Sequence, residues 1–135
     1  MCIKKNTDWI NKYKIFFTTS YSTNAINPPE PIEANPGEVC TETFLVIGPF
    51  KTKICREACL KYISSSLFKF LLYCGRGTMQ VSQDVFRFVP LQDFTANSDI
   101  DWNQSIAEID AQLYRKYNLN NDEIDFIERM IKPMV

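Results

Sequence analysis

The sequence predicts an α+β domain in which a small mixed or antiparallel sheet is packed by several helices. Apolar runs rich in β-branched and aromatic residues lie in the first 50 residues, whereas helical periodicity dominates after residue 51. No internal repeat interrupts this order. With 135 residues, of which 45% are hydrophobic, the chain is long enough for one domain with a buried core.

The N-terminal part contains two predicted strands joined by a proline-rich connection. Residues 13–19 are aromatic and β-branched, which favours a strand. Four prolines remove backbone donors from residues 24–37, so we expect an irregular loop there. Residues 41–47 form the second strand, and a turn at Gly48-Pro49 ends it. Because this strand is apolar on both faces, we expect it to be central in the sheet.

The middle of the chain predicts two consecutive helices. Thr52 has the side chain of an N-cap, and the serines at 64–66 interrupt the first helix and can cap the second, which Gly75 ends. We expect an apolar stripe to be buried on each helix and the charged residues of the first helix to lie off its stripe. The stripe of the first helix is Ile54, Cys55, Ala58, Cys59, Tyr62 and Ile63. The charged residues off this stripe are Lys53, Arg56, Glu57 and Lys61. The stripe of the second helix is Leu67, Phe68, Leu71 and Leu72.

The C-terminal part predicts a short strand and two capped helices. Residues 85–89 alternate in polarity and end at Pro90, as in an edge strand. Capping boxes at 105–108 and 120–123 then open two helices. Their inward side chains are Ile106, Ile109, Leu113, Tyr114 and Tyr117 in the first, and Ile124, Ile127 and Ile131 in the second. We therefore divide the single domain into an N-terminal strand and loop (1–39), an α/β core (40–94) and a helical part (95–135).

Charge is distributed unevenly along the chain, although the net charge is only -1. The segment 1–23 carries +3 and 24–50 carries -4, while 51–92 carries +5 and 93–135 carries -5. A basic middle between acidic flanks is the pattern of a one-sided contact with a polyanion. Ordinary surface charge that happens to cluster is the alternative interpretation.

The five cysteines and the absence of histidine predict buried free thiols rather than a metal site. The cysteines contain no C-x-x-C pair, and four thiolates at these spacings do not match a zinc site. No run of 18 apolar residues exists, and the N-terminus lacks the apolar region of a secretory signal. We therefore expect a cytoplasmic protein with no membrane partner.

The sequence contains no recognisable catalytic group. Asn27-Pro28-Pro29-Glu30 resembles the motif of amino-methyltransferases, but Glu30 stands where an aromatic ring would stack on a flipped base. No Gly-rich turn for S-adenosylmethionine follows a strand. Asp99 and Asp101 are interpreted as helix-entry or solvated acids rather than magnesium ligands. We expect no catalysis by this chain, and a small metal nuclease is the weakest alternative.

Five blocks in order resemble the C-terminal region of bacterial type II restriction-modification N6-adenine DNA methyltransferases. They are C-T-E-T-F-L-V-I-G-P-F at 40–50, L-F-K-F-L-L at 67–72, F-V-P-L-Q-D-F at 88–94, E-I-D-A-Q-L-Y-R-K-Y at 108–117 and E-I-D-F-I-E-R-M-I-K-P-M at 123–134. The helix–loop–strand–Pro order is also similar to the target recognition domains of type I specificity subunits. One departure is an extra residue between Thr78 and Gln80, where the family has a hydrophobic residue followed directly by Thr-Gln.

This resemblance implies a target recognition domain that binds double-stranded DNA beside a methyltransferase catalytic domain of the same or a companion chain. It implies no cofactor in this chain, because S-adenosylmethionine would bind to the parent enzyme. A structural module that joins methyltransferase and nuclease parts without contacting DNA is the alternative. The chemistry of DNA contacts then indicates the candidate residues, with arginine and polar side chains for base edges and lysines for phosphates. The candidates are Arg76, Thr78, Gln80, Gln83 and Arg87 for bases, and Lys51, Lys53 and Lys69 for the backbone.

Overall fold

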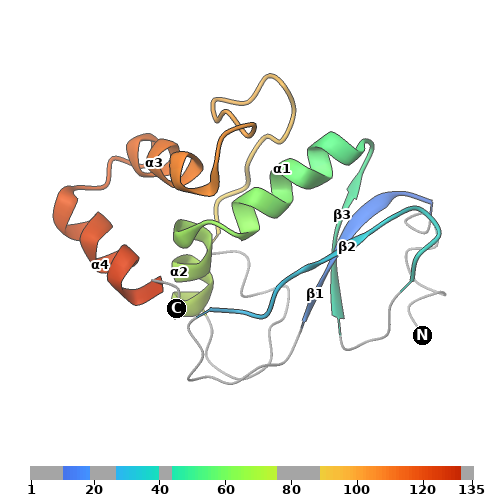
Figure 1. Cartoon of the computed structure of the whole chain (residues 1–135), viewed down its shortest axis with the longest axis horizontal. Coiled ribbons are helices and arrows are strands. Elements are labelled where there is room, and N and C mark those ends of the chain that lie inside the picture. Colours follow the sequence, from blue (N-terminus) through green and yellow to red (C-terminus); the bar gives the residue numbers. More distant parts are fainter. Residues whose placement is uncertain (1–10, 19–26, 40–43, 76–88, 132–135) are drawn as a thin grey trace.

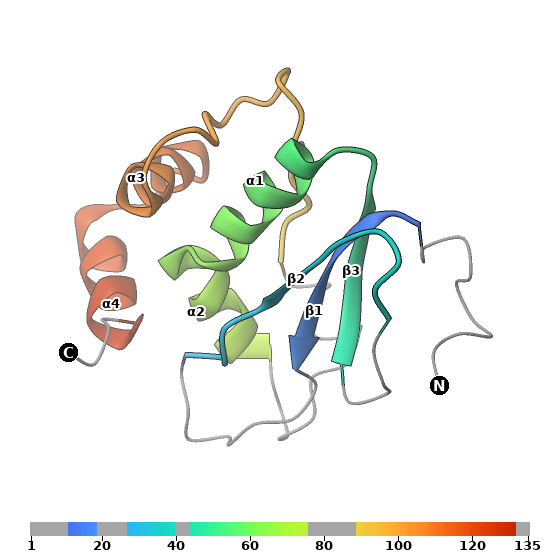
Figure 2. The ribbon, with the colours of Figure 1, turned by 45° about the vertical axis from the view of Figure 1, so that its right-hand side comes forward.

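The fold combines a three-stranded antiparallel sheet with four helices, as the α+β prediction requires. The structure is a computed structural model that describes residues 11–18, 27–39, 44–75 and 89–131. The strands are β1 (Tyr13–Thr18), β2 (Ile32–Ala34) and β3 (Phe44–Phe50). The helices are α1 (Lys53–Ile63), α2 (Ser66–Gly75), α3 (Ile106–Lys116) and α4 (Asn121–Ile131). Figures 1 and 2 show α1 between the sheet on one side and α3 on the other.

The sheet corrects three predictions for the N-terminal part. Within the described sheet β1 is central and β3 lies at an edge, because β1 pairs with β2 through one side and with β3 through the other. The proline-rich segment is not wholly irregular, since β2 pairs with β1 from Lys14 to Phe16. Gly48 and Pro49 lie inside β3, which continues until Phe50 pairs with Tyr13. Gly48 has a φ of 138°, a conformation that favours glycine.

The predicted helix starts are confirmed by their caps. The Thr52 hydroxyl accepts from the Cys55 amide at 3.2 Å, and the Ser105 hydroxyl accepts from the Glu108 amide at 3.2 Å. Asn120 and Glu123 form a reciprocal pair, in which each backbone amide donates to the other side chain at 2.8 to 2.9 Å. These bonds satisfy amides that the first turn of a helix leaves without partners. At the start of α2 the Ser65 hydroxyl likewise accepts from the Phe68 amide at 3.2 Å. Local sequence therefore indicates where all four helices begin.

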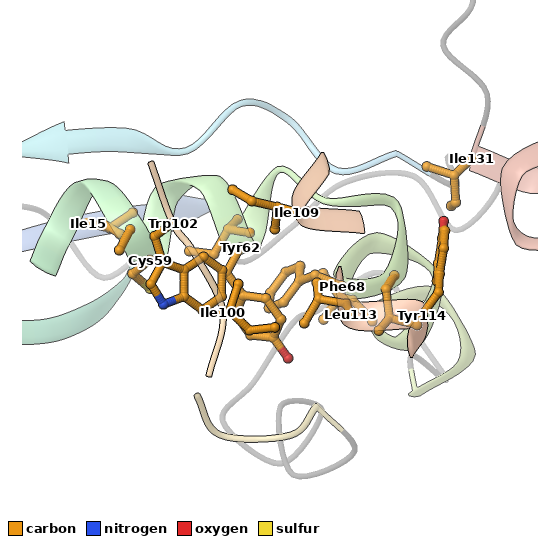
Figure 3. Close-up of a cluster of buried hydrophobic side chains, with 14 of the residues drawn as sticks. Ile15, Cys59, Tyr62, Phe68, Ile100, Trp102, Ile109, Leu113, Tyr114 and Ile131 are labelled. Carbon is orange, nitrogen blue, oxygen red and sulfur yellow. The ribbon is translucent and has the colours of Figure 1, made fainter. Parts of the chain in front are cut away.

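One hydrophobic core joins the sheet to all four helices. Figure 3 follows this core from Ile15 on the sheet to Ile131 on α4. Tyr62 of α1 lies near its middle, where its ring contacts the ring of Phe68 at 5.4 Å and that of Trp102 at 5.9 Å between centroids. Each aromatic pair at this spacing stabilises the fold by about 1 kcal/mol beyond the contribution from burying the two rings. Tyr62 and Phe68 therefore serve packing, as their helical spacing predicted.

Two predictions for α1 are wrong. Ile54 was expected in the buried stripe, but its side chain is 77% exposed because no described element covers the first turn of the helix. The core face begins one turn later at Ala58. Arg56 was expected off the stripe, but it is 1% exposed because its helix position faces β2. None of the described helices is long and apolar enough to cross a membrane.

Candidate nucleic-acid interface

The predicted base-contacting residues Arg76, Thr78, Gln80, Gln83 and Arg87 lie outside the described residues. Most of the short strand predicted at 85–89 lies outside them as well. The structure does place the three predicted phosphate contacts, Lys51, Lys53 and Lys69. The geometry of the interface is therefore built from these lysines and from the elements that hold them.

Lys51 and Lys53 are brought together at the start of α1, on either side of its N-cap Thr52. Both side chains are exposed, and the first turn of α1 contains no acidic residue. Lys53 reaches Glu57 one turn later at 3.9 Å, which is a weak contact between exposed groups. The partial positive charge of the helix N-terminus adds to the charge of the two ammonium groups. This end of α1 is suited to an anion such as a phosphate.

Lys69 is not part of this group. It lies on α2, which follows the opposite end of α1, and its side chain is half-buried. Figures 1 and 2 show the start of α1 beside the end of β3, well separated from α2. The structure therefore brings two of the three predicted phosphate contacts together and separates the third.

Arg56 holds β2 against α1 and is not a surface charge. Its Nη1 donates to the carbonyl oxygen of Ala34 and to Oδ1 of Asn35, each at 2.8 Å. Its Nη2 contacts Glu33 Oε2 at 3.2 Å, and the guanidinium lies 5.2 Å from the centre of the Tyr13 ring. Three strand residues and Asn35, which directly follows β2, thus surround one side chain, and Arg56 is unavailable to DNA.

Lys61 also acts inside the protein. Its Nζ donates to the carbonyl oxygens of Trp102 at 2.9 Å and of Gln104 at 3.2 Å. These bonds connect α1 to the segment that precedes α3. Two of the five described basic residues between 51 and 75 therefore stabilise the fold, so the charge of the basic segment overstates its exposed positive surface.

Asp110 of α3 caps the start of α2 from outside that helix. Its carboxylate accepts from the Ser66 amide at 2.9 Å and from the Leu67 amide at 3.3 Å. Burial raises the pKa of this carboxyl above its ordinary 3.8, and this effect exceeds the lowering by the hydrogen bonds from Ser66 and Leu67. Sequence analysis missed this residue because its partners lie about 44 positions away along the chain.

The raised pKa of Asp110 predicts a specific dependence of stability on pH. The folded protein holds this proton more tightly than the unfolded chain, so the contribution of Asp110 to stability is largest below the unfolded pKa and decreases as pH rises through the folded pKa. In Asp110→Asn this titration is absent. As pH rises from the ordinary aspartate pKa of 3.8 through the higher folded pKa, wild type should therefore lose free energy of unfolding relative to Asp110→Asn. Urea unfolding across this range measures the difference, and a constant value would contradict the assignment.

The acids of the 95–104 segment have structural partners. Asp99 pairs with Lys116 at 3.0 Å. Asp101 accepts from the Asn103 amide at 3.1 Å and from Gln104 Nε2 at 2.9 Å. Within the described ranges, no group of three or more histidine, cysteine or acidic residues has the arrangement of a metal site. The three described cysteines, Cys55, Cys59 and Cys74, are free, as predicted. The predicted burial holds only for Cys59, whose pKa burial raises to about 12, because Cys55 is half-buried and Cys74 is exposed.

An apolar hollow of about 410 Å³ lies between β3, α1 and residues 89–94. Tyr62 lines it and donates to the carbonyl oxygen of Pro90 at 2.8 Å. Gln92 donates to the Tyr117 hydroxyl at 2.7 Å, and Leu91 is 94% exposed. This surface directly follows the segment predicted to contact bases and is apolar, so it does not itself supply hydrogen bonds to base edges.

No protein-family model, curated protein or solved structure matches this chain.

Proposed function

We propose that this chain is the DNA target recognition domain of a bacterial restriction-modification methyltransferase. It binds double-stranded DNA and determines which sequence the parent enzyme modifies, without catalysis of its own. The observation that carries the proposal, beside the resemblance of the five sequence blocks, is the pair of exposed lysines at the start of α1. They form a site for phosphate, because the first turn of α1 contains no acidic residue that would repel the anion.

The distribution of charge supports a one-sided contact. Residues 93–135, which include α3 and α4, carry a net charge of -5 and would be repelled by a duplex. Figures 1 and 2 show α4 at one end of the described structure, well away from the start of α1. The duplex therefore approaches the part of the domain that carries Lys51 and Lys53, at a distance from α4.

Under this proposal the roles of the residues are divided by chemistry. Lys51 and Lys53 hold the sugar-phosphate backbone and so fix the position of the duplex. Arg76, Gln80 and Arg87 supply the base contacts, since arginine pairs with guanine O6 and N7 and glutamine with adenine N6 and N7. Thr78 and Gln83 add hydrogen bonds beside them, and Lys69 contacts a separate part of the backbone.

The parent enzyme would act in the cytoplasm and methylate adenine N6. Its S-adenosylmethionine would be held by a catalytic domain in the same or a companion chain, which is the protein partner of this domain. The target recognition domain contributes the position of the duplex, so that the chosen adenine lies at the catalytic centre.

Removing the two lysine charges tests the phosphate contacts. Lys51→Gln/Lys53→Gln should weaken duplex binding by about tenfold near 0.1 M salt and reduce the slope of log K against log salt by about 2. Fluorescence anisotropy with a labelled duplex at several salt concentrations measures both quantities. Arg115→Gln/Arg129→Gln removes the same charge from exposed positions on α3 and α4 and should change neither. Equal losses in the two double variants would show that only net charge matters.

Substituting the predicted base contacts tests specificity separately. Arg76→Ala, Gln80→Ala and Arg87→Ala should each relax preference at a base pair, at a cost of about 1–3 kcal/mol against the cognate site. Competition between cognate and altered duplexes gives this preference. If affinity and preference both stay unchanged, these residues do not contact the bases.

The alternative function is a structural module that joins methyltransferase and nuclease parts. The observation that favours it is the apolar hollow with the exposed Leu91 at its margin, because contiguous apolar surface is typical of protein contacts. Under this alternative, purified chain binds no duplex at low salt. The DNA titration therefore separates the two functions.

A further inference from the structure

A second surface of the domain, formed by α2 and α4, combines apolar and acidic residues. A groove of about 420 Å³ runs between these helices. Its apolar walls come from α2, from the residue before the α4 cap and from α4 itself, and the two helices pack directly against each other. We call it the acidic groove; its apolar residues are Leu67, Phe70, Leu71, Leu119, Phe126 and Ile127.

Phe126 is the feature of the acidic groove that packing does not explain. Its side chain is 49% exposed, although its ring meets Phe70 edge to face at 5.8 Å between centroids. By contrast Ile127, the next residue, is 4% exposed. A large aromatic ring left half in water beside other apolar side chains is typical of a surface that a partner covers.

The rim of the acidic groove is negative. Asp122 and Glu123 line it, each one turn before an apolar groove residue of α4. Glu123 already accepts from the Asn120 amide, so part of its role is to cap α4. Asp122 is exposed and has no hydrogen-bond or ion-pair partner within the described residues. The helix as a whole has four acidic residues against Arg129 alone.

We propose that the acidic groove binds an amphipathic helix of a partner protein, whose apolar side chains cover Phe126 and whose Lys or Arg residues pair with Asp122 and Glu123. The charge of the rim selects a basic partner and excludes nucleic acid. The apolar floor supplies the affinity that ion pairs between exposed groups do not. The groove lies on α2 and α4, away from Lys51 and Lys53, so the partner and the phosphates held by these two lysines occupy different surfaces.

A designed peptide tests this surface without knowledge of the natural partner. The probe is a helical peptide of about 15 residues with a leucine stripe flanked by lysines, compared with the same peptide carrying glutamates in place of the lysines. Fluorescence anisotropy with the full chain should show saturable binding of the lysine peptide and at least about tenfold weaker binding of the glutamate peptide.

Matched variants distinguish the groove from general acidity. Asp122→Asn should weaken binding of the lysine peptide at least about threefold, whereas Asp125→Asn, which removes the same charge outside the groove lining, should leave it unchanged. Phe126→Ala should weaken it more than about fivefold, whereas Ile54→Ala, at an exposed apolar position on α1, should not. Circular dichroism melts confirm that each variant is folded.

The outcomes are decisive in both directions. Equal effects of Asp122→Asn and Asp125→Asn would show binding to the acidic helix in general and would overturn the proposal. Absence of saturable binding, or equal binding of the two peptides, would overturn it too. Because Lys51 and Lys53 are unchanged in these variants, failure here leaves the DNA titration as an independent result.

Discussion

Replacing Arg56 with methionine should lower the free energy of unfolding by about 3 kcal/mol. Methionine keeps much of the aliphatic volume, so the loss comes mainly from the acceptors left behind. The Ala34 carbonyl oxygen and Asn35 Oδ1 would each lose a 2.8 Å bond, and Ala34 is fully buried. A buried acceptor without a donor costs about 1–3 kcal/mol. Urea unfolding monitored by tryptophan fluorescence measures the change.

The salt bridge to Glu33 contributes little to this effect. Glu33 is 54% exposed, so water screens the pair, and Glu33→Gln should cost less than about 0.5 kcal/mol. Lys53→Met is the matched control on the same helix, where the side chain is 62% exposed and a similarly small loss is expected. A loss below about 1 kcal/mol in Arg56→Met would show that β2 is held by other contacts.

Asp110→Ala should destabilise the fold by about 2 kcal/mol at pH 7. The Ser66 and Leu67 amides would lose the carboxylate that accepts from them, although the Ser65 hydroxyl would still accept from the Phe68 amide at 3.2 Å. The first turn of α2 would then be less stable, and the hydrogen bonds that join α2 to α3 through Asp110 would be lost. Hydrogen exchange should show faster exchange of the Ser66 and Leu67 amides relative to Phe68.

A control variant distinguishes the loss of the cap at Asp110 from the loss of one negative charge. Asp125→Ala removes a carboxylate from an exposed position on α4 and should change stability by less than about 0.5 kcal/mol. If Asp110→Ala and Asp125→Ala have equal effects, or if the Ser66 and Leu67 amides exchange as in the wild type, the capping role of Asp110 is wrong.

The parts of the fold that sequence predicts are those determined by neighbouring residues. The apolar composition of β1 marks a strand without reference to the rest of the chain. Thr52, Ser105 and Asn120 mark helix starts because each side chain bonds to an amide three residues later. Such local signals need no knowledge of tertiary structure.

The parts that sequence missed depend on contacts between distant segments. Strand β2 has only three residues, two of them exposed, so it has no apolar pattern to detect. Arg56 is buried because β2 supplies its partners, and its burial could not be predicted once β2 was assigned to a loop. Within the described strands, the position of β3 beside a central β1 likewise depends on pairing between distant segments.

The candidate interface shows the same division. Exposure of Lys51 and Lys53 follows from their place beside an N-cap, which the sequence indicates. The separation of Lys69 from them follows from the length of α1 and the turn at Ser64–Ser65, so it required the structure. The acidic groove pairs Phe70 with Phe126, 56 positions apart in the sequence, and no local pattern connects the two.

Selection of duplexes from a random-sequence pool by the purified full chain tests the central claim most directly. At about 0.1 M salt the account predicts enrichment of a defined sequence, with affinity that falls as salt rises because phosphate contacts release counterions. Recovery of a pool with no sequence enrichment, or no recovery of DNA at all, would contradict it.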